Sequence, residues 1–346
     1  MNLTNPPYED LGDPEPIRPL FADRPPKNFE SWEDQREVLK TELAELVGSQ
    51  SFDLFNMKPE QVDSFERPEY TGTVYKQPTG PDSRQTVLVM EPKRIKISPR
   101  PGMVIPFYHP DAMAGIDLEN HTPILEDRII QFGLHLVQQG YVVVCSEAFP
   151  YNTVEEPEDN TGFAWWEAAA RKLLTDHPDW TGIGKLVWDN ERAMDLLLDQ
   201  QDIDHDMVGV MGHSLGGKIA FYSGVMDERV RATVCSDFGM GYSFTNWDAP
   251  WYLGDRIHRP EFTLAHHHLL AIHAPRPFLL VGGEADRPAS WQYINEAKQA
   301  YALYGKEDAV GFFDHASGHR PTPESLNIAY TWLANQFNLE EQSWVL

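Results

Sequence analysis

The sequence predicts an α/β protein with a mostly parallel central sheet and helices on both faces. From residue 103 onward, short apolar runs alternate with longer segments whose apolar residues recur at helical spacing. The runs Tyr141–Cys145 and Met207–Met211 contain almost no polar residue, as expected for strands that helices cover on both faces. Crossovers between such strands are expected to be right-handed.

The composition narrows the classes of function. The chain has 346 residues, 41% hydrophobic and 23% charged, so it can bury a large core without disulfide or metal crosslinks. Its 28 basic and 53 acidic residues give a net charge of −25. A field of this sign repels phosphate backbones and anionic lipids, so nucleic acids and membrane surfaces are not expected partners. An acidic rim is also expected to repel carboxylate products and to disfavour substrates rich in uronic acids.

The N-terminal region is expected to be an appendage. Residues 1–68 are predicted to form an arm and a helix packed on a main domain of residues 69–346. The arm is rich in proline and acidic residues, which predicts extended chain. Asn28 or Ser31 can cap the helix, which is expected to run to about Val47.

An antiparallel hairpin is expected to open the main domain. Thr71–Lys76 and Thr86–Met90 are short and β-prone, and Gly80, Pro81 and Asp82 between them favour a turn. Strands and helices then alternate. The predicted strands are Met103–Phe107, Tyr141–Cys145, Met207–Met211, Val230–Cys235, Pro277–Val281 and Ala309–Phe313. The predicted helices are Ile124–Gln139, Ala164–Leu174, Leu186–Leu198, Leu215–Gly224, Ser290–Tyr304 and Pro323–Asn335.

The sequence as given indicates a cytoplasmic protein. Its first residues have neither the basic nor the apolar region of a secretion signal, and no segment approaches the ~20 apolar residues of a membrane span. Cys145 and Cys235 lie inside apolar runs, which predicts buried free thiols.

The strongest chemical signal is the run Gly212–Gly217, with the sequence Gly-His-Ser-Leu-Gly-Gly. It follows the predicted strand Met207–Met211 and opens a predicted helix, which is the context of a nucleophile elbow. A sharp turn there would expose the hydroxyl of Ser214 above the sheet, near the positive end of the helix. Ser214 is therefore the candidate nucleophile.

A serine nucleophile needs a histidine base and an acid that orients the base. With this elbow, the acid is expected to precede the histidine in the chain. Asp286 is the preferred acid because it follows the predicted strand Pro277–Val281 and so reaches the same rim of the sheet. Glu284 is the local alternative, and Asp237, just past the strand that ends at Cys235, is the distant one.

The base is predicted to follow the last strand. His319 lies in a loop after a glycine and before the last helix, where an imidazole can swing over the serine. His315, closer to the strand end, is the alternative and fits a packed histidine equally well.

These motifs resemble those of the α/β-hydrolases, and within them the branch of acetyl xylan esterases, dienelactone hydrolase-like proteins and prolyl-oligopeptidase-like peptidases. The resemblance spans roughly Glu69 to Leu333. It rests on Gly212–Gly217, on the carboxylate loop Gly282–Asp286 and on Gly318-His319, with Gly184–Asp189 similar to the preceding helix. It implies the α/β-hydrolase fold with insertions at the rim and a Ser-His-Asp triad.

Two groups are expected to stabilise the oxyanion of the reaction. The Leu215 N–H, at the start of the helix after the elbow, is one donor. The second is expected from the segment Pro106–Asp111, where Tyr108 can donate a backbone N–H or its phenol. This segment lacks the His-Gly pair of many related lipases, and Tyr108 could equally be a packed aromatic residue.

Two insertions at the rim are predicted, over about residues 147–183 and 237–265. Both follow strand ends and are too long for ordinary loops. Their aromatic residues could stack on sugar rings or acyl groups, or could simply pack. The aromatic residues concerned are Phe149, Tyr151, Phe163, Trp165, Trp166, Tyr242, Phe244, Trp247, Trp251 and Tyr252.

No metal or other cofactor is expected. His266, His267 and His268 would point about 100° apart on a helix and cannot all bind one ion, and no carboxylate–histidine zinc motif accompanies them. Nearby His258 and His273 do not change this reading.

The sequence thus predicts a serine hydrolase of carboxylic esters that acts through an acyl-enzyme. The expected substrate is a small-molecule or carbohydrate ester, and the resemblance suggests a carbohydrate acetyl group. Two alternatives stay open: a peptidase or amidase of the prolyl-oligopeptidase-like group, and a non-catalytic binding protein with a hydrolase fold.

Overall fold

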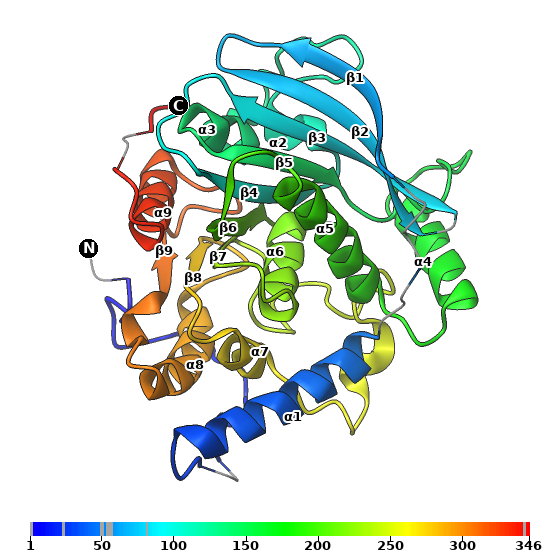
Figure 1. The fold of residues 1–346 in the computed structure, drawn as a ribbon. Coiled ribbons are helices and arrows are strands. Elements are labelled where there is room, and N and C mark those ends of the chain that lie inside the picture. The colour runs from blue at the N-terminus through cyan, green and yellow to red at the C-terminus, as the bar shows by residue number, and fades with distance from the viewer. Residues whose placement is uncertain (1–2, 23–24, 49–51, 53–57, 81, 342–343) are drawn as a thin grey trace.

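The computed structural model describes residues 3–22, 25–48, 52, 58–80, 82–341 and 344–346. Parts of the predicted N-terminal region, and Pro81 of the predicted turn, lie outside these ranges. The described residues form a nine-stranded sheet in the order β1-β2-β3-β5-β4-β6-β7-β8-β9 (Figure 1). The strands are β1 Glu60–Glu66, β2 Tyr70–Gly80, β3 Ser83–Pro92, β4 Arg100–Phe107, β5 Val142–Glu147, β6 Ile203–His213, β7 Ala232–Ser236, β8 Phe278–Gly282 and β9 Val310–Asp314.

The sheet is parallel from β5 to β9 and antiparallel over its first strands. β2 and β3 form the predicted hairpin, in which Thr73 lies opposite Val89. β3 pairs antiparallel with β5, and every later pair is parallel. The predicted sheet type is confirmed.

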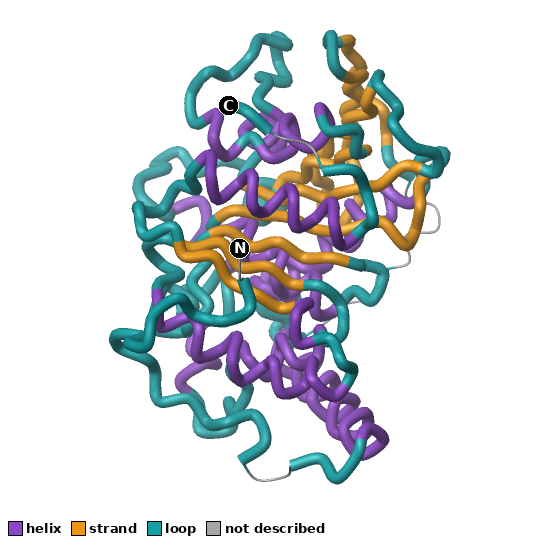
Figure 2. Tube along the Cα trace, turned by 90° about the vertical axis from the view of Figure 1, so that its left-hand side faces the viewer, coloured by secondary structure: helices purple, strands orange, loops and turns teal. Residues whose placement is uncertain are grey.

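Helices cover both faces of the sheet (Figure 2). Along β5, Val142 and Val144 pack into a core with α4, α5 and α6, whereas Val143 and Cys145 point into a second core with α3 and α9. Side chains alternate between faces along a strand, so an apolar strand serves both cores. The helices are α1 Phe29–Val47, α2 Pro110–Ala114, α3 Phe132–Gln138, α4 Ala164–Asp176, α5 Gly182–Leu198, α6 Leu215–Met226, α7 His266–His273, α8 Trp291–Leu303 and α9 Pro323–Gln336.

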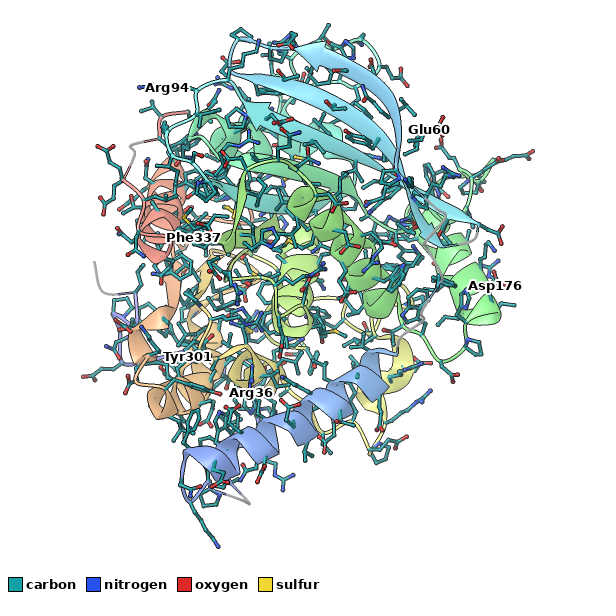
Figure 3. The ribbon with its side chains drawn as sticks, in the orientation of Figure 1. Arg36, Glu60, Arg94, Asp176, Tyr301 and Phe337 are labelled. Carbon is teal, nitrogen blue, oxygen red and sulfur yellow. The ribbon has the colours of Figure 1, made fainter. Side chains whose placement is uncertain are left out.

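Helix α1 lies outside the sheet layers, against α7 (Figure 1). Asn28 caps it by accepting the Ser31 N–H at 2.9 Å, as expected. Two side chains labelled in Figure 3, Arg36 of α1 and Tyr301 of α8, bond the C-terminal end of α7. These contacts of α1 and α8 with α7 therefore join the N-terminal helix to the rest of the fold.

The two edges of the sheet differ. β1 is an edge strand whose side chains are mostly exposed, with Phe65 as its buried residue. At the other edge, the Phe312 N–H of β9 donates to the Leu3 carbonyl oxygen at 2.9 Å, so the N-terminal arm runs beside this strand.

Two expectations about elements are wrong. Of the helix predicted over Ile124–Gln139, the structure forms α3 and a single 3-10 turn at Arg128–Ile130. The Gln131 amide donates to the Ile124 carbonyl and Ile116 forms a β-bridge with Pro123, which holds the first residues of the predicted helix in a loop. The strand β1 was not expected, since its polar sequence hides the alternation that marks a half-buried strand.

Cys145 and Cys235 are buried free thiols, as predicted. Among the residues that the structure describes, no helix has the length and apolar character that crossing a membrane requires.

Candidate active site

Ser214 stands at a sharp turn between β6 and α6. Its backbone has φ 54° and ψ −115°, a conformation that residues other than glycine rarely adopt. A Cβ on Gly212 would lie 2.0 Å from the Gly216 carbonyl oxygen, and a Cβ on Gly216 would lie 2.1 Å from the Pro106 carbonyl oxygen. Both positions therefore need glycine, and the motif forms the predicted strand-turn-helix.

His319 reaches Ser214 from the loop after β9. Its Nε2 lies 3.0 Å from the Ser214 Oγ, within hydrogen-bond distance. The imidazole is partly exposed, with 38% of the side-chain surface open to solvent. The structure thus brings together the two residues that the sequence predicts as nucleophile and base.

The carboxylate on His319 is Asp237, which directly follows β7. Its Oδ2 lies 2.6 Å from the His319 Nδ1, and its side chain is fully buried. The expectation that Asp286 contacts His319 is wrong. The chain turns back after β8, so that Asp286 lies beside Gly282 and points away from the histidine toward the segment after Asp237.

Asp286 binds backbone instead. It accepts the N–H groups of Phe238 and Gly239 at 2.9 Å each and that of Met240 at 2.7 Å, together with the Ser290 hydroxyl at 2.9 Å. Asp286 therefore fixes the segment that follows the carboxylate on His319.

Asp237 binds the opposite loop in the same way. Its oxygens accept the N–H groups of Gly283 and Glu284 at 3.1 Å each and of Asp286 at 2.9 Å. Each aspartate thus holds the loop from which the other projects.

The pKa values of the two carboxylates are shifted in opposite directions. Burial alone would raise the pKa of Asp237, but the hydrogen bonds from His319 and from the loop N–H groups hold it below its usual value. Burial, and then the negative charge of Asp237, raise the pKa of Asp286 to about 6. Asp237 is therefore the carboxylate that stays ionised as the pH falls.

Comparisons with known proteins give a family match and a fold. A family described as "Glucuronyl esterase, fungi" matches residues 180–256, the segment that contains Ser214 and Asp237. A glucuronoyl esterase from Solibacter usitatus has a similar structure, with a TM-score of 0.70 and 16% identity over 94% of this chain and 98% of that chain. The chain has the α/β-hydrolase fold.

Two curated proteins match this chain in sequence. YtaP of Bacillus subtilis (strain 168), named as a hydrolase without a stated substrate, is 27% identical over 58% of this chain and 68% of its own length. The carbohydrate esterase MZ0003, from an unknown prokaryotic organism, is 30% identical over 34% of this chain and 31% of its own length. Its match therefore spans less than a third of that esterase.

The side chains of the alternative acid and base have surroundings different from those of Ser214, His319 and Asp237, which form the candidate triad. The side chain of Glu284 is exposed, although its N–H binds Asp237. The His315 Nδ1 lies 2.8 Å from the Ser317 Oγ, and its Nε2 has no partner among the described residues. Within the part of the chain that the structure describes, neither side chain forms a hydrogen bond with Ser214, His319 or Asp237.

The two predicted oxyanion donors come from different elements of the fold. Leu215 is the first residue of α6, so its N–H is one of the unpaired donors of a helix start. Tyr108 follows β4 and lines the same cleft as Ser214. Its ring packs edge-on against Phe107 and Trp166, and burial raises the pKa of its phenol.

The cleft above Ser214 has a volume of about 980 Å³. It extends from the triad over β2 and β3 and along the loop before α3. Carboxylates outnumber cationic side chains on its walls. The carboxylates are Asp111, Glu119, Glu126, Asp127 and Glu147, and the cations are Lys76 and Arg320. The cleft therefore favours neutral over anionic groups.

The histidine run is packed inside the protein. The His266 Nδ1 lies 2.6 Å from the Met240 carbonyl oxygen, and its Nε2 lies 3.0 Å from the Tyr222 hydroxyl. The His267 Nε2 lies 2.8 Å from the Arg18 carbonyl oxygen. These rings bind the segment after Asp237 and the N-terminal arm.

The insertion over residues 237–265 contains a buried lysine contact that the sequence did not reveal. Lys218 of α6 lies 4.0 Å from the ring centre of Trp247 and 4.3 Å from that of Tyr252, and donates to the Thr245 hydroxyl at 2.7 Å. Burial lowers the pKa of Lys218 to about 7. At least part of the aromatic content of this insertion therefore packs onto the helix that follows the elbow.

Proposed function

We propose that this α/β-hydrolase is a serine hydrolase of carboxylic esters, acting through an acyl-enzyme. One observation carries the proposal. Ser214 Oγ, His319 and Asp237 form a continuous hydrogen-bonded chain at the base of a cleft large enough for a substrate. The comparisons support it, since the matched family and the relatives are named as esterases or hydrolases.

The first step is attack on the ester carbonyl. His319 Nε2 takes the proton of Ser214 as the hydroxyl oxygen forms a bond to the carbonyl carbon. Asp237 holds the proton on His319 Nδ1, so that Nε2 is the basic nitrogen, and stabilises the imidazolium that forms.

The carbonyl oxygen becomes an oxyanion in this step. Leu215 N–H, at the positive end of α6, is the proposed first donor, and the Tyr108 region is the proposed second. His319 then gives its proton to the leaving alcohol, and the ester bond breaks. Water releases the acid by the same route, which regenerates Ser214.

The proposed substrate is an ester of a carbohydrate. Its support is the name of the matched family and that of the carbohydrate esterase, together with the charge of the cleft. An esterified carboxyl group is neutral, whereas hydrolysis releases a carboxylate. The acidic cleft would accept the first and repel the second, which favours product release.

A covalent probe tests the mechanism. A fluorophosphonate should label the protein once, at Ser214, and Ser214→Ala should abolish both labelling and hydrolysis of p-nitrophenyl acetate. Ser223→Ala is the matched control, because Ser223 lies on α6, is buried and has a hydroxyl with no hydrogen-bond partner among the described residues. Full activity of Ser214→Ala would overturn the proposal.

A substrate panel tests the carbohydrate assignment. Values of kcat/KM are compared for acetylated xylan, an alkyl ester of glucuronic acid and simple alkyl esters of rising acyl length, whose alkoxide leaving groups match those of the carbohydrate esters. The proposal expects one of the two carbohydrate esters to exceed every simple ester of similar leaving group. Higher values for the simple esters would remove the carbohydrate assignment and leave the esterase.

A further inference from the structure

Three residues next to the triad in the chain bond to one another. One precedes the nucleophile, one precedes the acid and one follows the base; they are His213, Ser236 and Arg320. The His213 Nδ1 lies 3.1 Å from the Ser236 Oγ, and its Nε2 lies 3.1 Å from the Arg320 Nη1. We call these three residues the second layer. Its central residue is the neighbour of the nucleophile, whereas the central residue of the triad is His319, so the second layer adds a direct link between the segments of the nucleophile and the acid.

The chemistry of Arg320 fixes the proton of His213. A guanidinium only donates hydrogen bonds, so the His213 Nε2 must be the acceptor. The Nδ1 of the neutral ring then carries the proton and donates it to the Ser236 hydroxyl oxygen. His213 is fully buried, and burial, followed by the charges of His319 and Arg320, lowers its pKa to about 3. The ring stays neutral across the working range of an esterase.

Contacts on both sides hold the second layer in place. The His213 ring lies 4.7 Å from the His319 ring between centroids, and 6.4 Å from Phe132. The Arg320 Nη2 donates to the Asp127 Oδ2 at 2.7 Å, which ties it to the loop before α3. His213 thus touches the catalytic histidine as well as connecting its loop to the elbow.

The triad needs this connection, because its members come from three separate chain segments. His319 sits in a partly exposed loop, and its bonds to Ser214 and Asp237 are the ones that change during the reaction. The second-layer bonds can stay intact throughout. Resting on the proposed function, we propose that His213 is a positioning residue, which holds the loops of the nucleophile, acid and base in register through Ser236 and Arg320.

The main test is His213→Phe, which keeps an aromatic ring and removes both hydrogen bonds. kcat is expected to fall about tenfold to a hundredfold, the size of effect that a small misplacement of reacting groups has. KM is expected to change less than about threefold, and the fluorophosphonate labelling rate should fall in parallel with kcat, because both report attack by Ser214.

The control is His135→Phe. His135 is also buried and also hydrogen-bonded to a hydroxyl, that of Tyr330 at 2.8 Å, but it belongs neither to the triad nor to the second layer. Its substitution should cost thermal stability of the same order as His213→Phe and leave kcat within about twofold. Equal loss of kcat in both variants would show a merely structural role and overturn the proposal.

Two further variants at residue 213 distinguish the contribution of the bond to Ser236 from that of the bond to Arg320. His213→Asn places an amide group near the Nδ1 position, toward Ser236, and His213→Gln places one near the Nε2 position, toward Arg320. Each is expected to recover part of the kcat that His213→Phe loses. Failure of both to exceed His213→Phe would contradict a role through these bonds.

Arg320→Met covers the case in which His213→Phe does not fold. Arg320 is 43% exposed in its side chain, so the substitution leaves the core untouched. It should lower kcat several-fold, together with the labelling rate. Unchanged kcat and labelling rate would overturn the positioning proposal alone, whereas hydrolysis that survives Ser214→Ala would overturn the proposed function.

Discussion

Two aspartates, one after β7 and one after β8, accept the same kind of backbone hydrogen bond but face different side chains. Asp237 and Asp286 are both fully buried, and each accepts three or more backbone N–H groups from the other's loop. Asp237 also faces His319, whereas Asp286 faces the Ser290 hydroxyl.

The difference comes from spacing along the chain. Asp237 is the first residue after β7, so its carboxylate lies at the rim beside the triad histidine. Asp286 comes four residues after β8, and the intervening turn carries it back beside Gly282. Being at a strand end is therefore too coarse a criterion for the catalytic acid; the number of residues past the strand decides which way the side chain points.

The largest expected effect is a loss of kcat on substitution of Asp237. Asp237→Asn should lower kcat by roughly 10³- to 10⁴-fold, because an amide cannot hold His319 in the required tautomer or stabilise its charged form. Steady-state kinetics on p-nitrophenyl acetate measure it. Asp248→Asn, at an exposed aspartate of the same insertion, is the control.

A loss of less than tenfold in Asp237→Asn would show that the acid lies elsewhere. If Asp286→Asn were then the inactive variant, the roles of the two aspartates would be reversed.

The next effect falls mainly on stability. Asp286→Ala leaves three buried N–H groups without an acceptor, so the free energy of unfolding should drop by about 2–3 kcal/mol. kcat should fall by no more than about tenfold, since the loop that carries Asp237 loosens but the triad bonds remain. Urea unfolding and kinetics on the same preparation test this. A loss of kcat without a loss of stability would contradict it.

A smaller effect depends on pH. In the folded protein Asp286 has a pKa of about 6, above the usual 3.8, so the folded state binds a proton that the unfolded state does not bind between these values. The destabilising charge is thus relieved as the pH falls. Relative to Asp286→Asn, the wild type should gain about 1 kcal/mol of unfolding free energy from pH 7 to pH 5.

Urea unfolding of both proteins at the two pH values measures that gain. If the unfolding free energy of the wild type minus that of Asp286→Asn stayed constant or fell from pH 7 to pH 5, Asp286 would not take up a proton in the folded state over this range.

The smallest effect concerns the third carboxylate of the same rim. Glu284→Gln should leave kcat within about twofold, because the side chain is exposed and only the backbone N–H of this residue meets Asp237. The same kinetic assay tests it. A drop approaching that of Asp237→Asn would place Glu284 in the triad.

Local features were predictable from sequence, and contacts between loops were not. The elbow is encoded by glycines that the turn requires, between a strand and a helix, so Ser214 and its surroundings follow from a short segment. The choice between Asp237 and Asp286 depends on how two loops 46 or more residues apart bind each other.

The second layer illustrates the same limit. His213 and Arg320 are 107 residues apart, and nothing in either local sequence predicts their hydrogen bond. Their position next to Ser214 and His319 was the one available signal. The helix predicted over Ile124–Gln139 was too long for a related reason. The side-chain amide of Gln131 donates to the Ile124 carbonyl oxygen, which a helix would use for a backbone hydrogen bond.

The two edges of the sheet have a consequence for handling the protein. A bare strand edge is a template for self-association. β1 carries Glu60, Asp63 and Glu66 along its exposed edge, so like charges keep copies apart there. β9 instead is shielded by Leu3, whose carbonyl occupies the Phe312 N–H. Deleting the first residues of this chain would free the Phe312 N–H and uncover a strand whose one charged residue is Asp314, so we expect the deletion to promote self-association at this edge.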